Sequence, residues 1–146
     1  MPDVICPAVG IVKETGTVTR FRSSDSSTQE DVVYTAHISD LAVACEEDDG
    51  VVTNIGFDVA ARQGPAGDVR QITLPYFVAV VRGGTEIVAK DVYEADLTFE
   101  GENGRARVRE TIRQHLSIDD LQQTRAYEIL IGFQLSDDEF IYNLSR

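Results

Sequence analysis

Hydrophobic and polar residues alternate with a period of two along most of this chain. In the segment 54–61, apolar side chains fall at every second position, at Ile55, Phe57, Val59 and Ala61. The segments 71–82, 86–99 and 126–135 follow the same pattern, and the shorter segments 4–12 and 16–21 are also predicted strands. A period of two is typical of strands that bury one face, so the pattern predicts an all-β fold.

Two segments depart from simple alternation, and a third allows a second interpretation. The long β-branched segment 31–45 changes phase near Ser39 and Asp40, which indicates a bulge or a bend. Pro75 interrupts the segment 71–82, and proline within a strand favours an edge position or a bulge. The segment 105–118 alternates as a strand, and a helix over 109–116 is the alternative interpretation.

Turn residues separate these segments. Gly83 and Gly84 predict a tight hairpin between segments 71–82 and 86–99. The sequence "GENG" at 101–104 predicts a second turn, which would make the strands on either side of it hairpin neighbours. The stretch "RSSDSSTQED" at 22–31 has four serines and no apolar side chain, so it is predicted to be an exposed loop.

One helix is indicated, at the C-terminus. Ser136 precedes Glu139 by three residues, with two aspartates between them, and this spacing is that of a capping box. A helix of about ten residues needs tertiary contacts to persist. We therefore expect it to pack Phe140, Ile141 or Leu144 against the rest of the protein.

The chain length suits one domain, 1–146, that can bury a core. Seven to eight short strands without alternating helices predict a β-sandwich of the immunoglobulin or fibronectin type with a short C-terminal helix. A jelly roll or a small barrel is the alternative. The chain has no tryptophan, so the marker of a true antibody domain is missing.

Charge narrows the classes of partner. Thirteen basic and 25 acidic residues give a formal net charge of −12 and a pI near 4.4. Such a charge repels nucleic acid and anionic lipid, so neither is expected to bind, and it favours solubility or a basic partner. No window of 18 apolar residues indicates a transmembrane helix, and "MPDVICP" lacks the basic and apolar regions of a signal peptide. We expect either a cytoplasmic protein or a mature form without its leader.

Cys6 and Cys45 are the only cysteines. In the first predicted strand Val4, Cys6 and Ala8 are expected to face inward, and Pro7 to restrict the strand to an edge. As a disulfide they would close a loop of about 40 residues and stabilise the fold by about 4 kcal/mol. The alternative is a pair of reduced cysteines in a cytosolic core. No CxxC or Cys–His spacing supports a nucleophilic or metal-binding role.

A row of arginines is unusual in so acidic a chain. On a strand their side chains would share one face. The members are Arg105, Arg107, Arg109 and Arg113. Across the turn at 101–104 these arginines would pair with Glu94, Asp96 and Glu100. The alternative is a candidate interaction patch for an anionic ligand or partner.

Tyr76 and Phe77 belong to the same candidate patch, because aromatic side chains are favoured anchors at interfaces. The continuous apolar run around them also fits a strand buried on both faces. His37 and His115 stand in no HExxH, GxSxG or SxxK motif, so each is expected on a polar strand face. The run "EEDDG" at 46–50 lacks the alternating ligands of a calcium loop and predicts a solvated turn. No metal or cofactor is expected.

The segments "ICPAVGIV", "TRF", "LPYFVAVV", "IVAKDVY" and "YEILIGFQLSDDEFIYN" occur in this order. In this order they resemble small, largely uncharacterised alphaproteobacterial envelope lipoproteins over nearly the whole chain. The resemblance includes no catalytic motif and implies a periplasmic protein anchored by a lipid-bearing cysteine ahead of this region. Cys6 does not fit that role, since "DVI" before it lacks small residues and Pro7 follows it. An oxidising periplasm would favour the Cys6–Cys45 bridge.

These observations together predict a non-enzymatic cell-envelope module for binding or assembly. It would be an accessory subunit of a larger complex, with another envelope protein as its partner. A small hydrolase or carbohydrate-active β-sandwich domain, using carboxylates or one histidine, is the alternative. A cytoplasmic sandwich with reduced cysteines is a third hypothesis.

Overall fold

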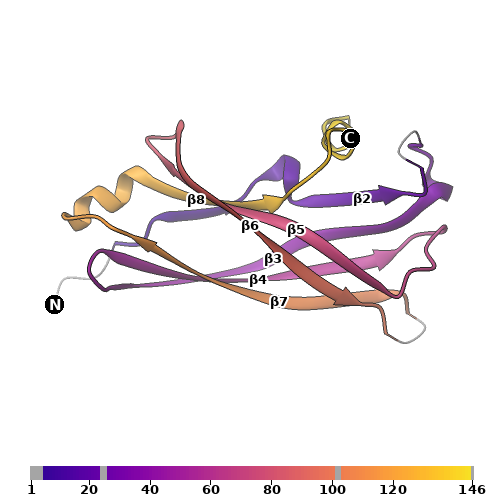
Figure 1. Ribbon diagram of the computed structural model, residues 1–146, viewed down its shortest axis with the longest axis horizontal. Helices are drawn as coiled ribbons and strands as arrows, with labels where there is room; N and C mark the ends of the chain where they lie inside the picture. The colour runs from indigo at the N-terminus through magenta and orange to yellow at the C-terminus, as the bar shows by residue number, and fades with distance from the viewer. Residues whose placement is uncertain (1–4, 24–25, 101–102, 146) are drawn as a thin grey trace.

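A computed structural model describes residues 5–23, 26–100 and 103–145. Its eight strands form two four-stranded sheets, followed by one short C-terminal helix (Figure 1). One sheet has the order β1-β8-β5-β6, with β1 at Ala8–Ile11, β8 at Tyr127–Phe133, β5 at Gln71–Arg82 and β6 at Glu86–Thr98. The other has the order β2-β3-β4-β7, with β2 at Thr17–Phe21, β3 at Val32–Glu47, β4 at Val51–Gln63 and β7 at Arg105–Leu116. The 3₁₀ helices η1 (Lys13–Thr15), η2 (Gln29–Asp31) and η3 (Leu121–Ala126) lie in connections.

The core lies between the two sheets and confirms the predicted alternation. Ile55, Phe57, Val59 and Ala61 of β4 all point inward and are at most 5% exposed. The facing sheet contributes the apolar residues of β5 and β8 to the same cluster. Phe57 meets Tyr76 edge to face across the core, with ring centroids 5.2 Å apart. The strands therefore form because alternate apolar positions bury one face of each sheet against the other.

β7 is a strand along its whole length, which excludes the helical alternative for 109–116. The predicted pairing across the turn at 101–104 is wrong, because β6 and β7 belong to different sheets. Only an isolated bridge between Glu100 and Arg105 links the two sides of that turn among the described residues. β7 instead pairs with β4, so the arginines lie beside β4 rather than beside Glu94 and Asp96.

The structure shows the irregularities that the sequence predicts in β3, in β5 and at the β5–β6 turn. The β3–β4 register shifts between Ser39 and Ala42, and Asp40 has a φ of 57°, which confirms the predicted bulge. Pro75 lies in a central strand rather than at an edge, contrary to the prediction. Its carbonyl accepts from Gln134 N–H, so its backbone nitrogen also faces the β8 side. The missing N–H is tolerated there because the β5–β8 pairing begins only at Tyr76. Gly83 and Gly84 have φ values of 64° and 80° and form the predicted β5–β6 hairpin.

The predicted disulfide joins Cys6 to Cys45, with their Cα atoms 5.8 Å apart. β1 is an edge strand, as expected, and pairs in parallel with β8. It begins only at Ala8, and Pro7 is buried while Cys6 and Ala8 are exposed. The expected inward orientation of Cys6 and Ala8 is therefore wrong, and Val4 lies outside the described residues. The bridge connects the segment before β1 to the end of β3, in the opposite sheet.

Helix α1 spans Asp137–Leu144 and begins at the predicted capping box. The Ser136 hydroxyl accepts from Glu139 N–H, and the Glu139 carboxylate accepts from Ser136 N–H. The expected packing of Phe140, Ile141 and Leu144 is wrong, since these side chains are 38%, 60% and 57% exposed. Within the described parts of the chain, no helix is long and apolar enough to cross a membrane.

Candidate functional site

The outer face of the β2-β3-β4-β7 sheet carries a concentration of positive charge. Alternate residues of β7 bury Ala106 and Ile112 and direct the arginines outward. β4 adds Arg62, which lies directly opposite Arg105 in the register. We call this surface the arginine face, and its members are Arg62, Arg105, Arg107, Arg109 and Arg113.

Asp58 of β4 neutralises the centre of the arginine face. Its carboxylate accepts from Arg107 Nη1 at 2.6 Å and from Arg109 Nη1 at 3.0 Å. The Asp58 side chain is only 15% exposed, whereas Arg107 and Arg109 are 59% and 44% exposed. The hydrogen bond from Arg109, with that from Arg107 and both positive charges, holds the pKa of Asp58 below its ordinary value.

The β3 bulge and a glycine complete this central network. Asp40, in the left-handed conformation, directs its carbonyl oxygen to Arg109 Nη1 at 2.8 Å. Its carboxylate lies 3.5 Å from Arg107 Nη1. A Cβ atom at Gly56 would approach the Arg109 guanidinium to 2.8 Å, so the glycine leaves room for Arg109 to lie across β4. The bulge therefore turns Asp40 toward the arginines.

Arg62 and Arg105 form the unneutralised end of the arginine face. Neither guanidinium has an ion pair or side-chain hydrogen bond among the described residues. Like charges directly opposite on neighbouring strands destabilise a sheet unless an anion lies between them. A shallow hollow of about 400 Å³ lies here, lined by both arginines together with His37, Thr35 and Arg107. This end of the face is therefore suited to an anionic group.

The other end of the face is polar but less charged. Arg113 lies 3.6 Å from the Asp48 carboxylate, and His115 Nε2 lies 2.8 Å from the Asp49 carbonyl oxygen. Both contacts involve the predicted turn at 46–50, where Asp49 has a φ of 53°. The described residues contain no group of three or more His, Cys, Asp or Glu that could hold a metal ion.

Tyr76 and Phe77 do not join the arginine face. Tyr76 is 1% exposed, so its place in a surface patch is wrong. Its hydroxyl donates to Glu110 Oε1 at 2.7 Å, and burial, then this hydrogen bond, raises the pKa of Tyr76 above its ordinary value. Phe77 is half-buried on the opposite sheet, with the Lys90 ammonium 5.1 Å from its ring centroid. Of the residues in the predicted patch, the arginines lie on this surface, and Tyr76 and Phe77 do not.

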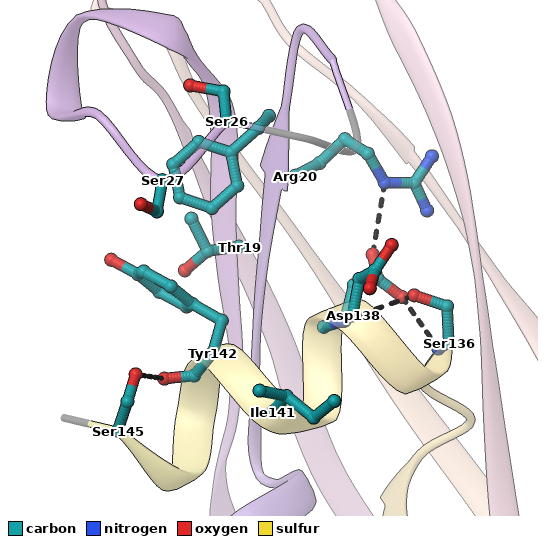
Figure 2. A pocket seen from close by; sticks show the side chains of 11 residues that line it. Thr19, Arg20, Ser26, Ser27, Ser136, Asp138, Ile141, Tyr142 and Ser145 are labelled. Atoms are coloured by element: carbon teal, nitrogen blue, oxygen red, sulfur yellow. Dashed lines mark hydrogen bonds and ion pairs between the residues drawn. The ribbon is translucent and has the colours of Figure 1, made fainter.

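A second concave region lies between α1 and β2 (Figure 2). This groove, of about 610 Å³, is lined by Thr19, Arg20, Phe21, Ser26, Ser27, Ser136, Asp138, Glu139, Ile141, Tyr142 and Ser145. Arg20 Nε donates to Glu139 Oε2 at 3.0 Å, and the rings of Phe21 and Tyr142 meet edge to face at 5.0 Å. Asn143 donates to the Glu14 and Thr17 carbonyl oxygens. These contacts hold α1 in place of the predicted apolar ones.

Sequence reasoning found four of the five arginines but missed Arg62 and the acidic partners. On β4, Asp58 and Arg62 each follow a buried residue, and this alternation indicates a polar strand face. Nothing in the sequence showed that β4 lies beside β7. Asp40 contacts the arginines because the β3 bulge turns it toward them. The change of phase near Ser39 predicts a bulge but not its direction.

Comparison with known proteins adds no assignment to this geometry: no family model, curated protein or solved structure matches the chain.

Proposed function

We propose that this protein is a non-enzymatic binding or assembly module of the cell envelope that holds an acidic segment of another envelope protein on its arginine face. The observation that carries the proposal is that Arg62 and Arg105 lie opposite each other beside the hollow, with no ion pair among the described residues. A carboxylate there would accept from two guanidinium groups, and charge-assisted bonds of this kind are the strong ones. The chain has a net charge of −12, so the arginine face is a local exception to an overall negative charge.

The immunoglobulin-like class is part of the same proposal. In that class the strands A, B and E lie side by side and face a sheet that contains C′, C and F. The order β3-β4-β7 facing β6-β5-β8 corresponds to A-B-E facing C′-C-F. β1 would then take the place beside F, in parallel. This correspondence supports an immunoglobulin-like binding scaffold.

The envelope location rests on the disulfide and the resemblance. A Cys6–Cys45 bridge is compatible with an oxidising compartment. The resemblance to envelope lipoproteins implies the periplasm and a lipid anchor ahead of this region. A thiol count on protein taken from native envelopes tests this part, since two free thiols would favour the cytoplasm.

Site-specific photocrosslinking in intact native envelopes tests the partner. We would place the crosslinker at Thr111, which is exposed on the arginine face opposite Gly56. The matched control position is Gln71, which is exposed on the opposite sheet. We expect a discrete adduct with an acidic envelope protein from Thr111 only. Adding Arg62→Glu and Arg105→Glu should abolish this adduct.

A control shows whether loss of the adduct comes from the changed charge or from misfolding. The double variant should retain the circular dichroism spectrum and melting temperature of the wild type, because both arginines are exposed. Equal adducts from Thr111 and Gln71, or an adduct that survives the charge reversal, would overturn the arginine face as the binding site.

A further inference from the structure

The outer edge of β6 has no strand beside it among the described residues. β6 ends its sheet and pairs only with β5. Three apolar residues of β6 are exposed: Ile87 by 63%, Val88 by 43% and Val92 by 54%. The tip of the β5–β6 hairpin also projects beyond the neighbouring strands (Figure 1). An exposed apolar edge strand is a surface on which another strand can pair.

Hydrogen bonds around β5 show which residues of β6 face this free edge. Pro75 accepts from Gln134 on the β8 side, and Phe99 N–H donates to Arg70 on the β5 side. Backbone groups of successive residues point to opposite edges of a strand. With the β5–β6 register, the backbone groups of Lys90, Val92 and Glu94 therefore point outward.

We propose that this edge pairs with the same edge of a second copy of the chain, antiparallel, about a two-fold axis at Val92. In that register Val92 lies opposite Val92 of the other copy, and Lys90 lies opposite Glu94 on both sides of the axis. Neither Lys90 nor Glu94 has an ion pair among the described residues, although the Lys90 ammonium lies over the Phe77 ring. The sheet would then continue across the interface, and the arginine face would stay free.

The charge order of residues 90–94 favours this partner and this register. An axis at Val88 would place Lys90 opposite Glu86, whose carboxylate already accepts from Arg82. Centring the axis on Lys90, Asp91 or Glu94 would place like charges opposite each other, which destabilises a strand pair. Centring it on Tyr93 would place Val92 opposite the Glu94 carboxylate. The strand "KDVYE" at 90–94 is thus complementary to itself in one symmetric antiparallel arrangement.

Sedimentation of the purified chain up to millimolar concentration tests the proposal. An ionic strength of about 0.15 M keeps the Debye length near 8 Å, so repulsion between the two net charges is screened. We expect a reversible dimer. Lys90→Glu and Glu94→Lys should each weaken it by roughly tenfold or more, because each variant opposes like charges twice.

Mixing the two variants gives the decisive measurement. Lys90→Glu presents two acids at the edge, and Glu94→Lys presents two bases, so an equimolar mixture should form a heterodimer while each variant alone is mainly monomeric. Lys13→Glu, an exposed change of the same charge in η1, is the matched control and should dimerise like the wild type.

Several results would overturn the proposal. A wild type that stays monomeric at millimolar concentration would do so. So would a dimer whose stability is unchanged by Lys90→Glu and Glu94→Lys, or an equimolar mixture of the two variants that stays monomeric. Unchanged melting temperatures of the variants would exclude misfolding as the cause of any loss.

Discussion

The two sheets are connected by a disulfide in one place and by a side-chain hydrogen bond in another. Cys6 and Cys45 join the segment before β1 to the end of β3, and Cys6 is exposed. Tyr76 of β5 donates to Glu110 of β7 from a position that is 1% exposed. The disulfide acts chiefly by restricting the unfolded chain, whereas the hydrogen bond satisfies a buried hydroxyl only in the folded state.

The two connections depend on the folded arrangement of the strands in different ways. The disulfide needs its two cysteines to be close and suitably oriented, and in the chain-entropy model its contribution is set largely by the length of the closed loop. The Tyr76–Glu110 bond needs the correct register of two strands in opposite sheets. The first connection therefore stabilises the chain as a whole, and the second is specific to this arrangement of β5 and β7.

Replacing both cysteines by serine should have the largest effect. The bridge spans a sequence separation of 39, and loss of the closed loop should lower the free energy of unfolding by about 4 kcal/mol. Urea unfolding of the double variant and of the wild type, each with and without reductant, measures this. A wild type whose stability is the same in both conditions would contradict the contribution assigned to the bridge.

Glu110→Ala should have the next largest effect. It leaves the buried Tyr76 hydroxyl without its acceptor, which costs about 1–3 kcal/mol of unfolding free energy. Adding Tyr76→Phe should recover part of this loss, because the unsatisfied hydroxyl is then removed. Urea unfolding of the two single variants and the double variant gives the coupling energy. Independent, additive losses would show that the bond does not connect the sheets energetically.

The sequence predicted the features that depend on local pattern, but not which distant strands become neighbours. The inward faces of β4, β5 and β8, the β3 bulge, the capping box at Ser136 and the cysteine pair all followed from local pattern or from a count. The placement of β7 beside β4 did not. The turn signal at 101–104 indicates only that the chain reverses, and a reversal can lead into the same sheet or across to the other one.

The candidate site failed to emerge fully from the sequence for the same reason. The arginine row is local to β7, but Arg62 and Asp58 join it only through the β4–β7 register. The contacts of α1 were mispredicted because its polar residues Glu139 and Asn143 found partners on β2 and at η1. The apolar residues predicted to pack, Phe140, Ile141 and Leu144, are exposed, and the ring contact of α1 comes from Tyr142 instead.

Ser136→Ala tests a third connection, in which α1 follows β8 of one sheet and contacts β2 of the other. Loss of the cap should lower stability by about 1 kcal/mol. The Glu139 carboxylate would still accept from N–H 136 and Arg20, so α1 should fray rather than detach. Hydrogen exchange at α1 amides measures the fraying. Gln134→Ala, an exposed change just ahead of the helix, is the control, and equal exchange in both variants would contradict the cap.

Asp58→Asn should have the smallest effect, because Asp58 links strands within one sheet rather than the two sheets. Its pKa is held below the ordinary value, so its ionised form stabilises the folded state. That stabilisation is present above the unfolded-state pKa of about 3.9 and is lost as the pH falls through the folded-state value. The wild type should therefore melt slightly above the variant at pH 7, with the difference disappearing in acid. Asp68→Asn, an exposed change of the same kind, is the control, and an equal, pH-independent difference in both variants would show that the central network contributes nothing.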